Sequence, residues 1–125
     1  MTTSARILIV DDDPAIRKLL AGTLAKAGYT VKTAGSGDDA IAQCASEPFD
    51  QVLSDVVMPK MNGHQLARWI AEYRPGTRMA LMSGWDPGCQ QCAHSPRCRV
   101  IAKPFDCRQI LSFVANVLAE SGETR

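Results

Sequence analysis

The sequence predicts an α/β domain in which a doubly wound parallel sheet of five strands is covered by helices on both faces. Short apolar runs typical of strands alternate along the chain with segments whose apolar residues recur every three or four positions. Strands that are connected through helices favour parallel pairing, with helices packed on both sides of the sheet. The 125 residues, 46% of them hydrophobic, suit one compact core and leave no room for a second. We therefore expect a single domain over residues 1–125, with its core at about 5–120 and a frayed polar tail at 121–125.

The first strand and helix carry the clearest signals. The run RILIV at 6–10 predicts a strand, and it is followed by apolar residues at helical spacing, namely Ile16, Leu19, Leu20 and Leu24. Asp13 is placed to cap this helix, Pro14 is tolerated in its first turn, and Gly28 predicts its end. The same alternation predicts strands at 29–34, 49–54, 78–82 and 99–102, and helices from about Asp38, after Gly63 and after Pro104.

One segment interrupts this order. The stretch GWDPGCQQCAHSPRC at 84–98 lies where a helix should connect the fourth and fifth strands. It contains two prolines and lacks apolar residues at helical spacing, so we expect a cysteine-rich loop to replace most of that helix.

The overall charge excludes several classes of partner. Lys and Arg number 14 against 13 Asp and Glu, and a net charge of +1 does not favour nucleic acid or an anionic membrane. No apolar run approaches the roughly 18 residues that span a bilayer, and the polar start MTTSAR does not resemble a secretion signal. We expect a cytoplasmic protein with no direct contact to nucleic acid or membrane.

Polar residues follow four of the predicted strands. They are Asp11, Asp12 and Asp13 after the first strand, Asp55 after the third, Ser83 after the fourth and Lys103 after the fifth. Because ligands gather at the carboxyl ends of parallel strands, these side chains are predicted to meet at one edge. Carboxylates brought close together raise one another's pKa unless a cation compensates, and Mg²⁺ prefers such all-oxygen sites. Lys103 and Ser83 could then hold phosphoryl oxygens, with Asp55 as the nucleophile.

Four motifs carry a family resemblance. ILIVDDDP, SDVVMPKMNG, MSG and AKPF stand in the order and at nearly the spacing typical of response-regulator receiver domains in two-component signalling. The chain resembles that family over essentially its whole length. The resemblance implies a flavodoxin-like sheet of strand order 2-1-3-4-5 and a cis Lys103–Pro104 peptide bond.

The resemblance also assigns roles at the strand ends. It makes Asp55 the phosphoacceptor, with Asp12 binding Mg²⁺ directly, Asp11 helping through water, and the carbonyl of Val57 completing the protein ligands. It also brings Ser83 and Lys103 into contact with the phosphoryl oxygens.

The expected function is therefore that of a response regulator in a His-Asp phosphorelay. The phosphoryl donor would be a sensor histidine kinase or a His phosphotransfer protein, and phosphorylation would switch affinity for a protein partner that the sequence does not identify. Such a domain is not an enzyme in the usual sense, since it catalyses only its own phosphorylation and slow dephosphorylation. One alternative is a metal- or redox-sensing module, and another is a Mg²⁺-dependent phosphohydrolase with an aspartate nucleophile. The second usually shows an Asp-x-Asp pattern after its first strand, which DDDP satisfies only formally.

Two departures from the family pattern bear on switching and on phosphate lifetime. Val100 occupies a position that is usually aromatic, and a β-branched side chain with one dominant rotamer cannot rotate in the same way. Val57 and Trp85 occupy the positions that flank the approach of hydrolytic water. Because both are apolar, we expect slow self-dephosphorylation.

The cysteine-rich segment is a third departure. Cys89, Cys92, His94 and Cys98 lie within ten residues and offer the donor set of a tetrahedral Zn²⁺ site. Free thiols, a disulfide and a redox switch remain open for the same residues.

Overall fold

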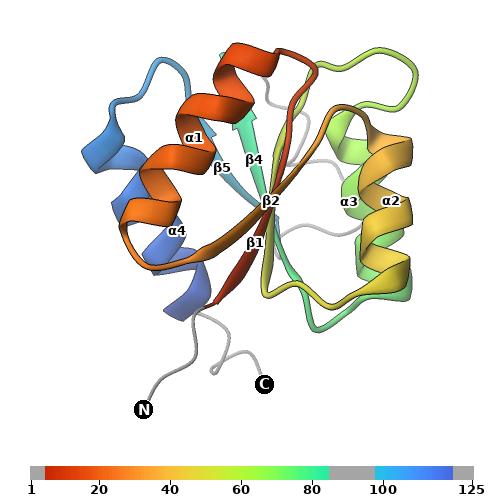
Figure 1. Cartoon of the computed structure of the whole chain (residues 1–125). Coiled ribbons are helices and arrows are strands. Elements are labelled where there is room, and N and C mark those ends of the chain that lie inside the picture. Colours follow the sequence, from red (N-terminus) through yellow and green to blue (C-terminus); the bar gives the residue numbers. More distant parts are fainter. Residues whose placement is uncertain (1–4, 85–97, 120–125) are drawn as a thin grey trace.

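Strands and helices alternate along the chain as the sequence predicts (Figure 1). The computed structural model describes residues 5–84 and 98–119. Within these ranges the elements are β1 (Arg6–Val10), α1 (Pro14–Lys26), β2 (Thr30–Ala34), α2 (Gly37–Ser46), β3 (Gln51–Asp55), α3 (Gly63–Tyr73), β4 (Arg78–Ser83), β5 (Cys98–Ala102) and α4 (Cys107–Ala119). The predicted loop between the fourth and fifth strands falls on residues 85–97, which lie outside these ranges. None of the described helices is long and apolar enough to cross a membrane.

The five strands form one parallel sheet of order β2-β1-β3-β4-β5, which confirms the predicted architecture. β3 and β4 each extend slightly further than the apolar runs suggested. Asp55 and Ser83 are the last residues of these strands and not the first residues after them. Both still pair with a neighbouring strand, Asp55 with Met82 and Ser83 with Ala102. The backbone of each is therefore fixed by the sheet.

Each face of the sheet carries its own hydrophobic core, because successive side chains of a strand point to opposite faces. Ile7 and Ile9 of β1 pack with α1 and α4, whereas Leu8 and Val10 pack with α2 and α3. Figure 1 shows the two helix pairs on opposite sides of the sheet. β1, β3 and β4 are buried along almost their whole length, so the ends of these central strands are the places where they can offer polar side chains.

The helix starts are set by side-chain caps. Asp13 accepts a hydrogen bond from the Ala15 amide at 2.9 Å, which confirms its predicted role at the start of α1. Ser36 caps α2, and Asn62 begins α3 with a capping box that Gln65 completes. Gly28 has a φ of 104°, a conformation that favours glycine, and lies two residues beyond the end of α1.

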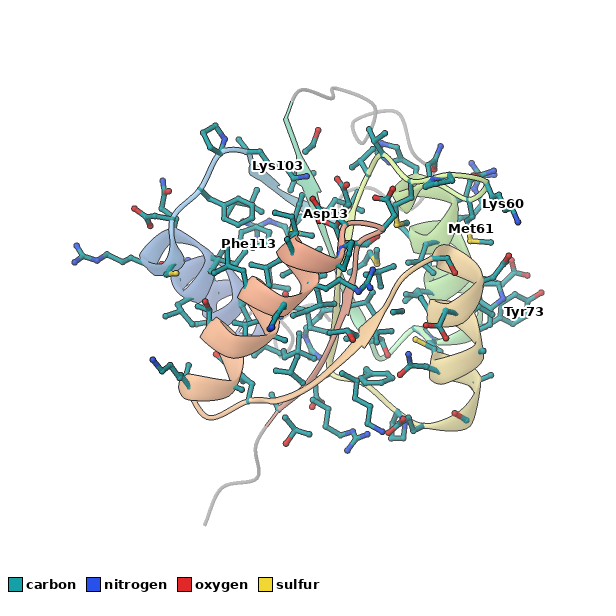
Figure 2. The ribbon with its side chains drawn as sticks, turned by 45° about the horizontal axis from the view of Figure 1, so that its top comes forward. Asp13, Lys60, Met61, Tyr73, Lys103 and Phe113 are labelled. Atoms are coloured by element: carbon teal, nitrogen blue, oxygen red, sulfur yellow. The ribbon has the colours of Figure 1, made fainter. Side chains whose placement is uncertain are left out.

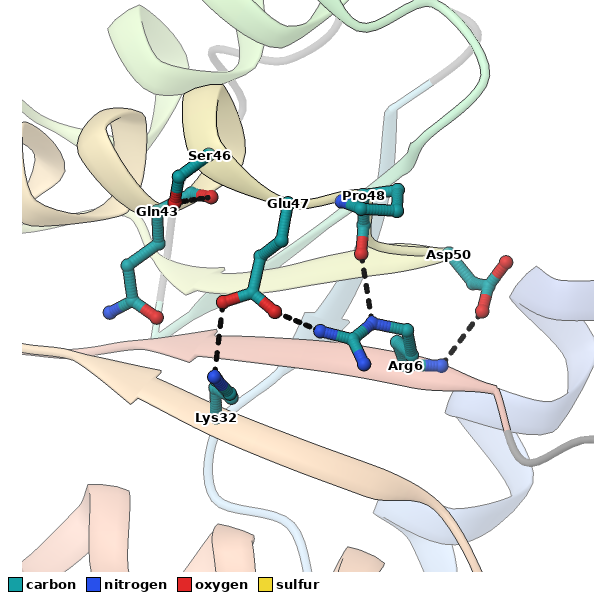
Figure 3. Close-up of polar contacts among 7 residues, drawn as sticks. All are labelled: Arg6, Lys32, Gln43, Ser46, Glu47, Pro48 and Asp50. Atoms are coloured by element: carbon teal, nitrogen blue, oxygen red, sulfur yellow. Dashed lines mark hydrogen bonds and ion pairs between the residues drawn. The ribbon is translucent and has the colours of Figure 1, made fainter.

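An ion-pair network lies toward the end of the sheet at which the strands begin (Figure 3). Arg6 pairs with Glu47, donates through Nε to the Pro48 carbonyl at 3.0 Å, and donates its backbone amide to Asp50 at 2.7 Å. Glu47 also pairs with Lys32 of β2 at 3.1 Å. These contacts tie β1 and β2 to the segment that precedes β3, at the end opposite the carboxyl edge.

Candidate functional site

Three carboxylates meet at the carboxyl edge of the sheet, where the sequence predicted them. One oxygen each from Asp11, Asp12 and Asp55 lies within 4.8 Å of the other two. β1 and β3 are neighbours, and Val10 pairs with Ser54, so the residues that follow, Asp11 and Asp55, lie at the same level. Asp11 and Asp55 are buried, whereas Asp12 is exposed. The carboxylate cluster is therefore buried on one side and open to solvent on the other.

Asp11 is the most constrained of the three. Its amide donates to the Ala34 carbonyl at 3.2 Å, and its Oδ1 accepts from the Asp13 amide at 2.9 Å. Burial raises the pKa of its carboxyl group, and the charge of Asp55 adds to this effect, while the Asp13 amide and Lys103 oppose it. Its Oδ2 is buried and accepts no hydrogen bond from the described part of the chain.

This donor set fits a hard divalent cation. A buried oxygen without a partner is uncommon in proteins, and here it lies within a cluster of three carboxylates. Mg²⁺ binds through one or two carboxylates and keeps several waters, so a site that is buried on one side and open on the other suits it.

A lysine pairs with the predicted phosphoacceptor. Lys103 Nζ lies 3.1 Å from Asp55 Oδ1, and the Lys103 amide donates to the Ser83 carbonyl at 2.8 Å. The Lys103–Pro104 bond is cis, as expected. Ser83 is buried at the end of β4. In Figure 2, which turns the carboxyl edge forward, Lys103 and Asp13 are labelled at this edge. Asp55 thus pairs with a cation and lies close to two further acidic groups.

The segment after β3 folds back tightly against Asp55. The Gly63 amide donates to the Val56 carbonyl at 2.8 Å, and a Cβ built on Gly63 would lie only 2.6 Å from the Asp55 carbonyl oxygen. Val57, predicted to offer its carbonyl to the metal, is a residue that is 77% exposed. The sequence indicated a turn at Asn62-Gly63, but the glycine's contact with the phosphoacceptor backbone depends on how α3 packs.

One residue near the site was not predicted from the sequence. Arg17 of α1 donates through Nη1 to the Asp11 carbonyl at 2.6 Å. The sequence offered a weak signal, because an arginine one turn into a helix can reach the loop that precedes it. The apolar spacing of α1 gives no reason to single it out.

Several predicted residues cannot be placed in the site. Trp85, Cys89, Cys92 and His94 lie outside the described residues, and Cys98 begins β5 with a side chain outside them. The zinc site and the role of Trp85 stay predictions. Val100 lies on β5 and is 40% exposed.

Most of the chain matches a known family. The family model described as "Response regulator receiver domain" matches residues 7–115. The response regulator receiver protein CpdR of Brucella abortus (strain 2308) is 34% identical over 115 residues, which cover 90% of this chain and 96% of CpdR. Other relatives are much longer, and the chain spans about a quarter of the length of several regulators that it matches.

Solved structures show the same fold. The chemotaxis protein CheY4 of Vibrio cholerae superposes with a TM-score of 0.84 at 29% identity, covering 92% of this chain and 99% of CheY4. The response regulator TrrA of Thermotoga maritima, solved in complex with Mg²⁺-BeF, gives a TM-score of 0.81 at 28% identity, over 90% of this chain and 98% of TrrA.

Proposed function

The chain belongs to the response-regulator receiver domain family of two-component signalling, and we propose on that premise that Asp55 is its phosphoacceptor. The observation that carries this proposal is the position of the Asp55 carboxylate, 3.1 Å from Lys103 Nζ and within 4.8 Å of oxygens of Asp11 and Asp12. A nucleophilic carboxylate flanked by a fixed cation and by a candidate metal site suits phosphoryl transfer, in which positioning and charge provide most of the catalysis.

The proposed step is transfer from a phosphohistidine. An oxygen of Asp55 attacks phosphorus as the phosphorus–nitrogen bond of the donor breaks, and the bonding electron pair stays on the imidazole nitrogen. Lys103 then pairs with phosphoryl oxygens, and the Ser83 hydroxyl donates to another. The backbones of both residues are held before the donor arrives, because the Lys103 amide donates to the Ser83 carbonyl and Ser83 pairs with Ala102, and this limits the reorganisation that the step requires.

Mg²⁺ is the proposed cofactor. Asp11, Asp12 and Asp55, together with the Val57 carbonyl, would hold it. When bound, it would offset negative charge on the phosphoryl oxygens. The Mg²⁺-BeF complex of TrrA supports this assignment, as does the buried Asp11 oxygen without a partner.

The proposed phosphoryl donor is a sensor histidine kinase or a His phosphotransfer protein, and the output is altered affinity for a protein partner. We infer one cytoplasmic receiver domain over residues 1–125 that acts as a signalling module and not as a classical enzyme. Its own catalysis would comprise phosphorylation and slow dephosphorylation. The exposed, apolar Val57 side chain supports the slow second reaction, because it offers no group to orient water.

Acetyl phosphate labelling tests the proposal. The wild type, Asp55→Asn and the surface control Asp39→Asn are incubated with acetyl phosphate and Mg²⁺, and their intact masses are measured. We expect the wild type and the control to gain one acid-stable, alkali-labile phosphoryl group that chelation of Mg²⁺ prevents, and Asp55→Asn to gain none. Equal gain by Asp55→Asn would refute the assignment, and turnover of a free phosphate ester would favour a phosphohydrolase.

The cysteine cluster supports a separate hypothesis, that Cys89, Cys92, His94 and Cys98 bind Zn²⁺. Elemental analysis of protein purified without a metal-affinity step tests it. Zinc at near one per chain supports the site, and its absence leaves thiol or disulfide chemistry for these residues.

A further inference from the structure

We propose that Arg17 is a positioning residue for the metal site, acting on Asp12 through the peptide bond between Asp11 and Asp12. The inference rests on the proposed function, since it concerns the Mg²⁺ site. Arg17 does not face the three carboxylates as a ligand. Its contact with the site is the hydrogen bond from Nη1 to the Asp11 carbonyl, at 2.6 Å.

The surroundings of Arg17 fix this contact. Asp11 follows the last residue of β1, and the Arg17 side chain satisfies its carbonyl oxygen. The guanidinium group lies against Gly35, where an added Cβ would be 3.2 Å from Nη1. Arg17 therefore lies in a slot between α1, the end of β1 and the segment after β2.

The position of Asp12 depends on this contact, because no hydrogen bond from the described residues holds its side chain. Asp12 is exposed, and its carboxylate accepts no hydrogen bond within residues 5–84 and 98–119. Its position is set by the two rigid peptide planes that flank it. The Asp13 amide, bonded to Asp11 Oδ1 at 2.9 Å, fixes the plane that follows Asp12. Arg17 fixes the plane that precedes it.

Charge and positioning predict opposite effects of removing Arg17. If only its positive charge mattered, its loss would reduce repulsion of a divalent cation and strengthen binding. If it positions Asp12, its loss weakens binding. The weakening should be greater for Mg²⁺, which requires near-octahedral geometry, than for Ca²⁺, which accepts a flexible site.

Calorimetric titration with MgCl₂ and CaCl₂ tests the inference on the wild type, Arg17→Met, Arg17→Lys and Lys18→Met. Arg17→Met is expected to bind Mg²⁺ on the order of 10-fold more weakly, a loss typical when a group that orients a metal ligand is removed. Its Ca²⁺ affinity should change less. Arg17→Lys keeps a donor and should restore much of the Mg²⁺ affinity. Lys18→Met removes the same charge from the neighbouring exposed position of α1 and should leave the Mg²⁺ affinity unchanged.

Thermal melts without metal show whether each variant folds. If Arg17→Met does not fold, Arg17→Gln, which is polar but too short to reach the Asp11 carbonyl, replaces it. A folded variant that binds Mg²⁺ as tightly as the wild type, or that loses Mg²⁺ and Ca²⁺ affinity by one common factor, overturns the inference. Failure of the wild type to bind Mg²⁺ would instead refute the metal site of the proposed function.

Discussion

Replacing Gly63 with alanine should destabilise the domain even though the residue begins a helix. A Cβ at this position would lie 2.6 Å from the Asp55 carbonyl oxygen and 2.9 Å from both Leu81 Cδ2 and Val56 Cα. Contacts this short require a shift, and two of the three atoms belong to the backbone. Gly63 does not have a positive φ, so the clash and not backbone strain decides the effect.

The net cost follows from two opposing terms. Overpacking costs about 1–3 kcal/mol, and the rigid neighbours place Gly63 near the upper limit. Alanine also lowers the entropy of the unfolded chain, which stabilises the folded state by about 0.4–1 kcal/mol. The net decrease in the free energy of unfolding is then about 2 kcal/mol. Unfolding entropy near ~2.1 cal/mol/K per residue gives about 0.26 kcal/mol/K for 125 residues. The Tm should therefore fall by about 8 °C.

Gly22→Ala provides the matched control. Gly22 lies within α1, and an added Cβ would meet nothing within 4 Å. The same substitution there should stabilise the domain by roughly 1 kcal/mol, because alanine is the better helix former. Circular dichroism melts of both variants test the pair, and acetyl phosphate labelling shows whether Asp55 is displaced. A Gly63→Ala variant that melts at or above the wild-type temperature would refute the reasoning.

Three further predictions concern the charges at the two edges of the sheet. Lys103→Ala should slow labelling from acetyl phosphate by roughly 10²-fold, because it removes a preorganised positive charge, and an unchanged initial rate of mass gain would contradict this. Burial raises the pKa of Asp11, so the folded state binds more protons and its stability falls as pH rises from 3.8 through the raised value. Asp11→Asn should therefore melt higher than the wild type at neutral pH without Mg²⁺, with the difference vanishing below pH 3.8; an equal Tm at neutral pH would count against a buried charge. Glu47→Gln breaks partly exposed ion pairs with Arg6 and Lys32 and should cost less than about 1 kcal/mol in denaturant unfolding, with labelling unchanged.

The sequence by itself determined the order of the described elements and the edge at which the site forms. Apolar periodicity distinguishes strands from helices, and parallel strands bring residues that follow them to one edge. Asp55 and Lys103, 48 positions apart, could therefore be predicted as neighbours before any coordinates. The cap at Asp13 was equally predictable, because it depends only on local sequence.

Only the tertiary structure decided how each residue of the site is used. Asp11 and Asp12 are adjacent and chemically identical, yet one is buried and the other exposed. Periodicity indicates the face on which a residue lies, but not which atom it meets across the fold. The contacts of Arg17 with the Asp11 carbonyl and of Gly63 with the Asp55 backbone depend on how α1 and α3 pack against the strands. Such contacts depend on shifts of a few tenths of an ångström between elements, a scale that residue spacing does not specify.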